Sequence, residues 1–459
     1  MAGIGFALRR LARSGTLGGL ATAYAHATLV SAGPWLLTIL AVAGINFFTI
    51  DQLATAEIAT FRVVVIYNFA FSLVFSGPVV LIVTRYLADR IYAKNVEEAP
   101  GMLLGALGLI FLTQGPIAIA FYGFTATLPL TTRVVAVVSY LLTAALWLVT
   151  VFLSAIKDFR SVTVTFVVGM ALGSVSGIAL FRSGANGLLL GLDLGLVFIV
   201  FVLIARILAE YPYPLVRPLA FISYFRRYWQ LTVYGFVYNA AIWIDKWIMW
   251  FAPQRRVIDG MPVYPTYDGA VFLAYLTIIP AMAIFVVNIE TDFFERYVAY
   301  YHDIEHQATL AHVKMRHNDL LVSLRRGLRN SIVLQGSISY VTILLAPALF
   351  EHIGIDFSQL VIFRFAVLGA FFHALLLFIL IVMAYFDLRN LILGISLLFL
   401  LTNGIFSVAS LHFGFAYYGY GYFLSSLLCF ATAYILVMGR VKELPYLTFV
   451  THNLSVRQR

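Results

Sequence analysis

Of the titratable side chains within the long apolar stretches of this sequence, five are candidates for function: Asp193, Asp245, Lys246, Arg364 and His373. Ionisable residues in such stretches are costly to bury and usually belong to substrate or ion pathways. With the orientation argued below, the four charged residues share roughly one depth, towards the outer face of a membrane. Two acids and two bases at one level predict ion pairs across a cavity mouth. Such pairs could form an outer gate or bind sugar hydroxyl groups.

Some of these residues also have an ordinary structural interpretation. Lys246 is flanked by tryptophans, so its ammonium group could extend to the membrane interface, and Arg364 could do the same. Asp193 has too short a side chain to reach far, which favours a pathway or pairing role. His373 could relay protons, but a hydrogen-bonded interior histidine is the more common case.

Prolines and tyrosines mark further candidates. Pro78 and Pro280 lie inside apolar stretches, where the missing N–H kinks or breaks a helix, so both are candidate hinges. Aromatic residues make up 15% of the chain, and four tyrosines cluster at the outer end of the last apolar stretch: Tyr417, Tyr418, Tyr420 and Tyr422. Their rings could stack on sugars, although an aromatic belt at the membrane interface is the favoured explanation.

One motif resembles a metal site. His302, Glu305 and His306 match the inverted zinc-peptidase pattern, but they lie in a charged helical stretch without a substrate cleft. We favour a solvated helix that docks a partner. The single cysteine, Cys429, excludes an intrachain disulfide or a cysteine-based metal site. P-loop and nucleophile-elbow motifs are absent, so we expect no catalytic residues, no metal and no cofactor.

The elements that must position these residues are transmembrane helices. Of 459 residues, 62% are hydrophobic and 11% charged, whereas soluble domains have about 25% charged residues. Runs of about 20 apolar residues span a bilayer as helices. Twelve spans are predicted, at residues 22–48, 61–84, 102–124, 134–156, 162–181, 187–208, 229–251, 270–289, 331–350, 360–383, 391–411 and 418–438.

The distribution of charge sets the orientation. The net charge is +9, but most lysines and arginines lie in alternate gaps between the spans. The other gaps, counted with the ends of the spans that border them, contain few: Arg62, Arg133, Arg182, Arg255 and Arg256. By the positive-inside rule, we expect both termini of this multi-pass protein to be cytoplasmic. The excess of basic over acidic residues therefore reflects membrane topology rather than nucleic-acid binding.

The predicted architecture is all-α, with about twelve transmembrane helices in two pseudo-symmetric bundles around a central cavity. An amphipathic segment (1–21) precedes a six-helix bundle (22–208), a proline-rich linker (209–228), a second six-helix bundle (229–438) with a cytoplasmic loop (291–330), and a tail (439–459). Weak self-similarity supports the division, because one spacing separates Gly33 from Pro78 and Gly235 from Pro280. A parallel repeat of this kind is common among transporters.

Two segments at the start of the chain carry a resemblance to a known family. The opening Met-Ala-Gly-Ile-Gly-Phe-Ala-Leu-Arg-Arg-Leu and the later Ser-Ala-Gly-Pro-Trp, which ends at Trp35, resemble the N-terminus of the PelG family. PelG proteins are inner-membrane subunits of Pel exopolysaccharide systems. They belong to the multidrug/oligosaccharidyl-lipid/polysaccharide (MOP) exporters, which are similar to Wzx and MATE proteins and have two six-helix bundles around a cavity.

The resemblance implies export of Pel polysaccharide, as nascent polymer or as a precursor. It also implies three partners: a PelF-like cytoplasmic glycosyltransferase, a PelD-like cyclic-di-GMP-sensing subunit and a PelE-like subunit. The loop 291–330 and the linker 209–228 are the candidate docking segments. The resemblance supplies no catalytic motif.

Two other functions are compatible with the residues. A proton- or sodium-coupled multidrug or small-molecule antiporter of the same fold would use Asp193 or Asp245 as the titrating group. A membrane glycosyltransferase or polymerase would need catalytic carboxylates at a water-exposed surface and usually a sizeable outer loop. The sequence shows neither, so a transporter is the favoured function.

Overall fold

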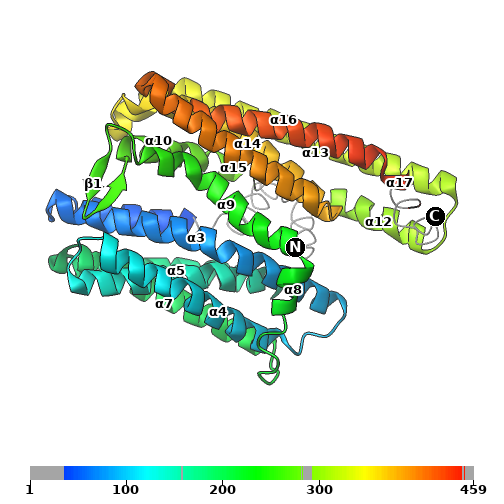
Figure 1. The fold of residues 1–459 in the computed structure, drawn as a ribbon, viewed down its shortest axis with the longest axis horizontal. Helices are drawn as coiled ribbons and strands as arrows, with labels where there is room; N and C mark the ends of the chain where they lie inside the picture. Colours follow the sequence, from blue (N-terminus) through cyan, green and yellow to red (C-terminus); the bar gives the residue numbers. More distant parts are fainter. Residues whose placement is uncertain (1–35, 157–158, 281, 283–291, 447–448, 450–459) are drawn as a thin grey trace, which may run out of the picture. The chain divides into compact units, whose positions relative to one another are not determined.

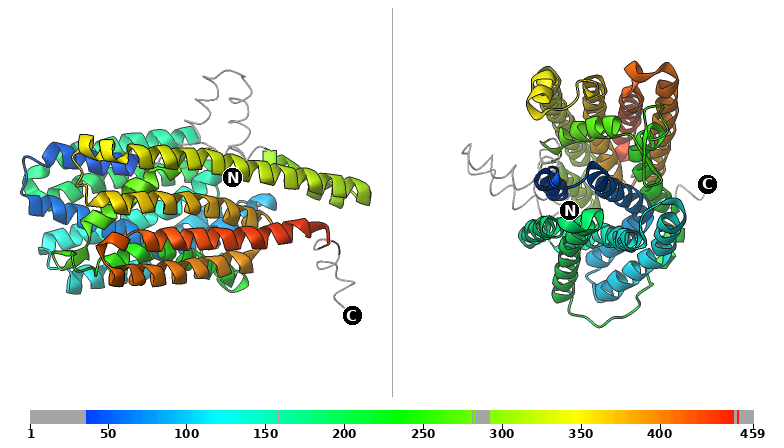
Figure 2. Two further views of the ribbon diagram at one scale, coloured as in Figure 1. Left: turned by 90° about the horizontal axis from the view of Figure 1, so that it is seen from above. Right: turned by 90° about the vertical axis from the view of Figure 1, so that its left-hand side faces the viewer.

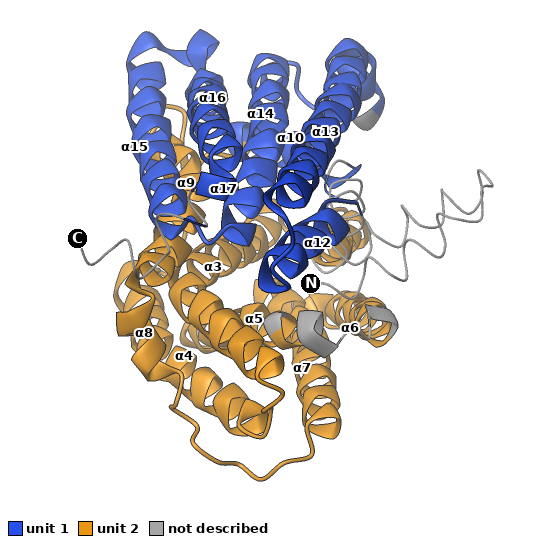
Figure 3. Ribbon diagram, turned by 90° about the vertical axis from the view of Figure 1, so that its right-hand side faces the viewer, with its two compact units in different colours: residues 1–31, 266–459 blue, residues 32–265 orange. Residues whose placement is uncertain are grey.

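The computed structural model describes residues 36–156, 159–280, 282, 292–446 and 449, and these residues are mostly helical (Figure 1). The predicted amphipathic segment 1–21, the start of the first span and much of the tail lie outside the described residues. The described residues form two compact units, shown in Figure 3. Residues up to 265 form unit 2, and residues from 266 onwards form unit 1.

Unit 2 consists of long helices and one small hairpin. Its elements in chain order are a helix Leu36–Thr49, α3 (Thr55–Tyr92), α4 (Ala99–Ala120), the π-helical turn η1 (Phe121–Thr125), α5 (Leu130–Ile156), α6 (Phe159–Ala179), the 3-10 turn η2 (Phe181–Ser183), α7 (Gly184–Glu210), α8 (Ile222–Arg227), α9 (Trp229–Met249), β1 (Arg256–Ile258) and β2 (Met261–Val263). Helix α3 packs against α4, α5, α7 and α9 and is therefore the centre of this unit.

Unit 1 is built around α14. Its elements are α10 (Pro265–Leu276), α12 (Phe294–Glu305), α13 (Leu310–Ile353), α14 (Gln359–Tyr385), α15 (Arg389–Phe413), the 3-10 turn η4 (Phe415–Tyr417), α16 (Tyr420–Lys442) and α17 (Leu444–Tyr446). Helix α14 packs between α13 and α16, and α16 also packs against α15. Helix α13 is 44 residues long and extends past the ends of α14 and α15 (Figure 2).

The helices agree with the predicted spans. Within the described residues, nine helices are long and apolar enough to cross a membrane, and they correspond to predicted spans two to six and nine to twelve. The other three predicted spans correspond to the helix Leu36–Thr49, to α9, and to α10 with the partly described residues after it. The prediction of a helical, multi-pass membrane protein is therefore confirmed.

The connection after α9 contains two short strands, which the predicted all-α architecture did not include. Strands β1 and β2 pair antiparallel, with Ile258 opposite Met261. Between them, Asp259 and Gly260 have φ angles of 47° and 81°, and Asp-Gly is the favoured pair for such a left-handed two-residue turn. The hairpin is fixed to α3, because Thr60 donates a hydrogen bond to Asp259 and the Tyr67 hydroxyl donates one to the Pro262 carbonyl at 2.7 Å.

Glycines allow the helices of unit 2 to approach closely. Helices α6 and α7 each carry three glycines at four-residue intervals: Gly169, Gly173 and Gly177 on α6, and Gly187, Gly191 and Gly195 on α7. A Cβ atom at Gly191 would lie 2.1 Å from the Gly177 nitrogen. Small residues at this spacing are typical of tightly packed membrane helices.

A second close approach joins α9 to α3. A Cβ atom at Gly77 would lie 2.2 Å from the Gly235 carbonyl oxygen, so the two backbones cross in contact. Because of this packing, α9 belongs to unit 2, and the boundary between the units falls at residue 265. The predicted boundary fell within residues 209–228. The division into two six-helix bundles stays a prediction.

Candidate functional site

A row of buried polar side chains follows one face of α3. Asn68, Ser72 and Ser76 are spaced four residues apart and are at most 1% exposed, so they lie on the same side of the helix. Each is hydrogen-bonded to a neighbouring helix. The Tyr122 hydroxyl donates to Asn68 Oδ1 at 2.6 Å, Trp147 Nε1 donates to Ser72 Oγ at 3.1 Å, and Gln114 Nε2 donates to Ser76 Oγ at 2.9 Å. We call these three side chains and their partners the polar row.

Asp193 lies on α7 inside the same unit. Its side chain is 5% exposed, and Ser139 Oγ on α5 donates a hydrogen bond to Oδ1 at 2.6 Å. Among the described residues, Oδ2 has no hydrogen-bond partner. A buried carboxylate oxygen without a donor is destabilising when the group is charged. Asp193 is therefore well placed to interact with a proton, a cation or a polar substrate group.

Asp245 and Lys246 on α9 form an ion pair with each other. Lys246 Nζ lies 3.1 Å from Asp245 Oδ1 and donates a hydrogen bond to the Ile242 carbonyl at 2.9 Å. The ammonium group also lies 5.6 Å from the centre of the Trp243 ring. Both residues are buried, and Lys246 is only 6% exposed. The side chain thus turns back along its own helix instead of extending to an interface.

Aromatic rings stack between α3, η1 and the end of α9. The Tyr67 ring stacks on Trp250 with centroids 4.6 Å apart and on Phe121 with centroids 5.4 Å apart. Phe71, one turn further along α3, stacks on Trp247 at 5.1 Å. Phe121 begins the π-helical turn η1, a distortion often found at functional sites. We call these five residues the aromatic stack.

Unit 1 contains a separate polar centre at His373. This residue is 2% exposed, and its Nδ1 atom is hydrogen-bonded to the Tyr422 hydroxyl at 2.9 Å. Tyr275 and Phe399 complete the aromatic surroundings, with ring centroids 6.0 and 5.2 Å from that of His373. This environment fits a hydrogen-bonded interior histidine, and a role in the substrate path stays a prediction.

The predicted tyrosine cluster does not act as one surface. Tyr422 and Tyr418 are buried, whereas Tyr417 is 48% exposed. The Tyr420 ring lies against Phe365 with centroids 3.7 Å apart. Within the described residues, only Tyr417 of the four has the exposure expected of an interfacial belt residue.

The predicted charges are only partly brought together. Asp245 pairs with its neighbour Lys246, whereas Asp193 and Arg364 pair with no oppositely charged side chain among the described residues. Arg364 is half-buried on α14, and its Nε atom has no hydrogen-bond partner within the described part of the chain. The gate of several ion pairs therefore stays a prediction, and the structure supplies one pair.

The two candidate hinges differ in their surroundings. Pro78 lies inside α3, directly after Gly77 at the crossing with α9. Pro280 follows an interruption, because α10 ends at Leu276 and Thr277 forms a turn. Proline cannot donate to the carbonyl four residues earlier, which here is that of Leu276. The helix is therefore interrupted before Pro280 but continuous through Pro78, and motion at either proline stays a prediction.

Residues 209–228 are held against α3 and α4 of the same unit by contacts around Glu98, Gly101 and Gly105, which we call the clamp. Glu98, at the start of α4, accepts hydrogen bonds from Tyr86 and Arg217 and forms an ion pair with Arg90 at 3.0 Å. The hydrogen bond from Tyr86, aided by the two arginines, holds the pKa of Glu98 below its ordinary value despite burial. The carboxylate therefore stays ionised and keeps its partners at neutral pH.

The clamp also depends on glycines of α4. Cβ atoms at Gly101 and Gly105 would lie 2.1 Å from the Val216 carbonyl oxygen and 2.0 Å from that of Pro218. The intervening Arg217 has a φ angle of 44°, a strained conformation for a non-glycine residue. These contacts were not predicted from the sequence, although three prolines within residues 209–228 and the four-residue spacing of Gly101 and Gly105 were the available signal.

The histidine motif lies on α12 and in the turn that follows it. His302, Glu305 and His306 are exposed. The nearby carboxylate of Asp303 accepts a hydrogen bond from Arg316 at 3.0 Å and contacts His312 at 3.1 Å, which joins α12 to α13. Within the part of the chain that the structure describes, no three histidine, cysteine or acidic side chains are grouped as metal ligands.

Comparisons with known proteins place the chain in a family. One family model, described as "PelG: Putative exopolysaccharide Exporter (EPS-E)", matches residues 1–449. No curated protein matches the chain at a significant level.

Solved structures share the fold. A MOP superfamily transporter from Pyrococcus furiosus is similar with a TM-score of 0.64 and 12% identity, over 91% of this chain and 96% of that one. An outward-facing multidrug resistance MATE family transporter of the MOP superfamily gives 0.63 and 12%, over 92% and 96%. At such identity the likeness shows the fold alone. The family match spans nearly the whole chain, and we conclude that the chain belongs to the PelG family of exopolysaccharide exporters.

Proposed function

We propose that this protein exports an exopolysaccharide, as nascent polymer or as a precursor, across the bacterial inner membrane. The observation that carries the proposal is the family match over residues 1–449. The protein acts as the transport subunit beside a separate synthase and catalyses no covalent step itself.

The interior of unit 2 is suited to this role. The polar row and the aromatic stack supply hydroxyl, amide and ring surfaces, which are the groups that bind sugar hydroxyls and sugar faces. Asp193 adds a carboxylate oxygen without a described partner. A conformation that opens these residues to the substrate would present them to a polymer.

The proposed orientation follows from the positive-inside rule. Both termini, the clamp around Glu98 and helix α12 then face the cytoplasm. Helix α12 is the proposed docking surface for a PelF-like glycosyltransferase, together with PelD-like and PelE-like subunits. Its exposed face carries Glu295, Val298, His302 and Glu305, a mixed polar and apolar surface on a helix that lies beyond the predicted spans.

A second candidate function rests on Asp193. A buried carboxylate with one free oxygen could bind and release a proton or sodium ion, as an antiporter requires. Such a site is compatible with two functions. The bound ion could drive export of the polysaccharide, or it could be exchanged for a drug.

Deletion of the gene in its native host, followed by complementation, tests the proposal. We expect deletion to abolish secreted polymer without changing drug tolerance, while the other subunits remain at normal levels. Normal polymer with increased drug sensitivity would favour the antiporter and reject the proposal.

A further inference from the structure

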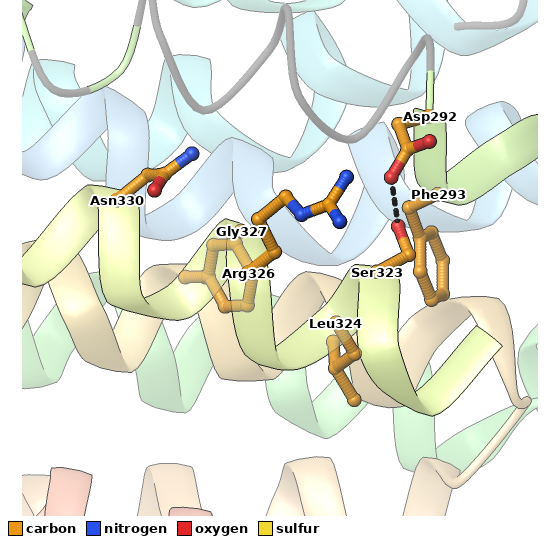
Figure 4. Close-up of a pocket in the computed structure, with 8 residues that line it drawn as sticks. Asp292, Phe293, Ser323, Leu324, Arg326, Gly327 and Asn330 are labelled. Carbon is orange, nitrogen blue, oxygen red and sulfur yellow. Dashed lines mark hydrogen bonds between the residues drawn. The ribbon is translucent and has the colours of Figure 1, made fainter. Parts of the chain in front are cut away.

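A cavity of about 260 Å³ lies in unit 1 beside the middle of α13. Its lining includes Asp292, Phe293, Ser323, Arg326, Asn330 and Phe378. Figure 4 shows how the first five of these side chains lie. Arg326 and Asn330 are separated by one helical turn, so both project from the same face of α13. The rings of Phe293 and Phe378 supply apolar walls.

The cavity lies where α13 changes from polar to apolar. Arg325, Arg326, Arg329 and Asn330 precede this boundary and are exposed. Beyond Ser331, large apolar side chains are exposed, including Val333 at 62% and Leu344 at 62%, as expected of a helix surrounded by lipid tails. The cavity is therefore at the depth of the lipid headgroups.

The donors of Arg326 are available within this cavity. Among the described residues, its guanidinium group makes no hydrogen bond or ion pair. Among the described residues of the lining, the one carboxylate is that of Asp292, and it accepts hydrogen bonds from Arg296 Nε at 2.9 Å and Ser323 Oγ at 2.6 Å. Partial burial opposes ionisation of Asp292, but the hydrogen bonds from Ser323 and Arg296, together with the charges of Arg296 and Arg326, lower its pKa overall. Asp292 thus stays charged and paired with Arg296, and within the described part of the chain the N–H groups of Arg326 have no hydrogen-bond acceptor.

We propose that Arg326 and Asn330 form a binding site for a phosphate ester at the headgroup level of the membrane. A guanidinium group binds two phosphate oxygens at once, and the Asn330 amide can donate a third hydrogen bond. The phenylalanine walls accommodate the apolar part of the ligand. The phosphate belongs either to a phospholipid headgroup or to a soluble phosphate ester such as a nucleotide. This site does not depend on the proposed export function.

The test uses the full-length protein, purified in neutral detergent and freed of lipid. Binding of phosphatidylglycerol, of the phosphate-free lipid diacylglycerol, and of UDP is measured for the wild type, Arg326→Gln, Asn330→Leu and the control Arg325→Gln. The control removes the same charge from the adjacent, exposed position outside the cavity lining. A monodisperse elution profile establishes that each variant is folded.

We expect Arg326→Gln to weaken binding of one phosphate probe about tenfold or more, and Arg325→Gln to change it by about twofold or less. Asn330→Leu tests the same cavity if Arg326→Gln does not fold. Retention of phosphatidylglycerol in excess inorganic phosphate identifies a headgroup, whereas displacement by phosphate or UDP identifies a soluble ligand. Equal effects of the two arginine substitutions, or no binding of either phosphate probe by the wild type, would overturn the proposal.

Discussion

Asn68 on α3 and Asp193 on α7 are held by the same turn of α5. Asn68 Nδ2 donates a hydrogen bond to the Ala136 carbonyl at 3.1 Å, and Asp193 Oδ1 accepts one from Ser139 at 2.6 Å. One turn of helix therefore joins the polar row to the buried carboxylate. Groups within one such network are expected to affect each other's energetics.

Replacing Asn68 with leucine should destabilise the protein by about 1–2 kcal/mol, because the buried Tyr122 hydroxyl loses its acceptor. Thermal unfolding of the purified protein measures this change, with Thr84→Val as the control at an exposed position. In the double variant with Ser139→Ala, the loss of unfolding free energy should differ from the sum of the two single losses by about 0.5 kcal/mol or more. Strict additivity would show that the turn of α5 does not couple Asn68 to Ser139.

Gly235→Ala should destabilise the crossing of α3 and α9 by about 1–3 kcal/mol, since the new methyl group would lie 2.5 Å from the Gly77 carbonyl oxygen. Gly108→Ala is the matched control, because nothing lies within 4 Å of its added Cβ atom. That control should be neutral or stabilising by up to about 1 kcal/mol. Equal melting temperatures for the two variants would contradict the close crossing.

Glu98→Gln should change how stability depends on pH. The pKa of Glu98 is lowered in the folded protein, so its contribution is complete above the ordinary value of about 4.3 and is lost as the pH falls through the folded pKa. The melting temperature of the wild type should therefore exceed that of Glu98→Gln at neutral pH, and the difference should shrink below about pH 4. Glu97→Gln, the exposed neighbour, should show no such difference.

Asp193→Asn should lower secreted polymer while the protein stays at its normal level in the membrane. The amide keeps the size of the side chain but cannot carry the charge that a cation or a polar substrate group would meet. Ser139→Ala, which removes only the donor to Oδ1, should have a smaller effect. Undiminished secretion by Asp193→Asn would remove this residue from the substrate path.

Substitution of Val298 and Glu305 by lysine should weaken recovery of the glycosyltransferase with the protein, because both residues lie on the exposed face of α12. Lys94→Glu, in the exposed turn after α3, provides a charge-changing control. Co-purification from native membranes measures the effect. Unchanged recovery of the glycosyltransferase would reject docking on this face.

The helical, multi-pass fold was predictable from the sequence because the apolar runs are long and regularly spaced. The π-helical turn at Phe121 and the β-hairpin at Asp259 were not predicted. Hydropathy does not register a single turn of altered hydrogen bonding, and the Asp-Gly pair lies in a connection for which no secondary structure was predicted.

The candidate site was only partly predictable. Asp193 and His373 were recognised because a titratable group stands out in an apolar run. Asn68, Ser72 and Ser76 were overlooked, because small polar side chains barely change hydropathy and their burial depends on tertiary packing. For Lys246 the sequence left two interpretations open, an ion pair or an extension to the membrane interface, and in the folded chain it pairs with Asp245.

The central claim is that this chain moves the polymer across the membrane. Inverted inner-membrane vesicles that contain the synthase subunits can be supplied with nucleotide sugar from outside, and polymer protected from an added glycoside hydrolase can then be measured. We expect protected polymer only in vesicles that contain this protein, with unprotected polymer still made in its absence. Equal protected polymer in vesicles without it would contradict the account.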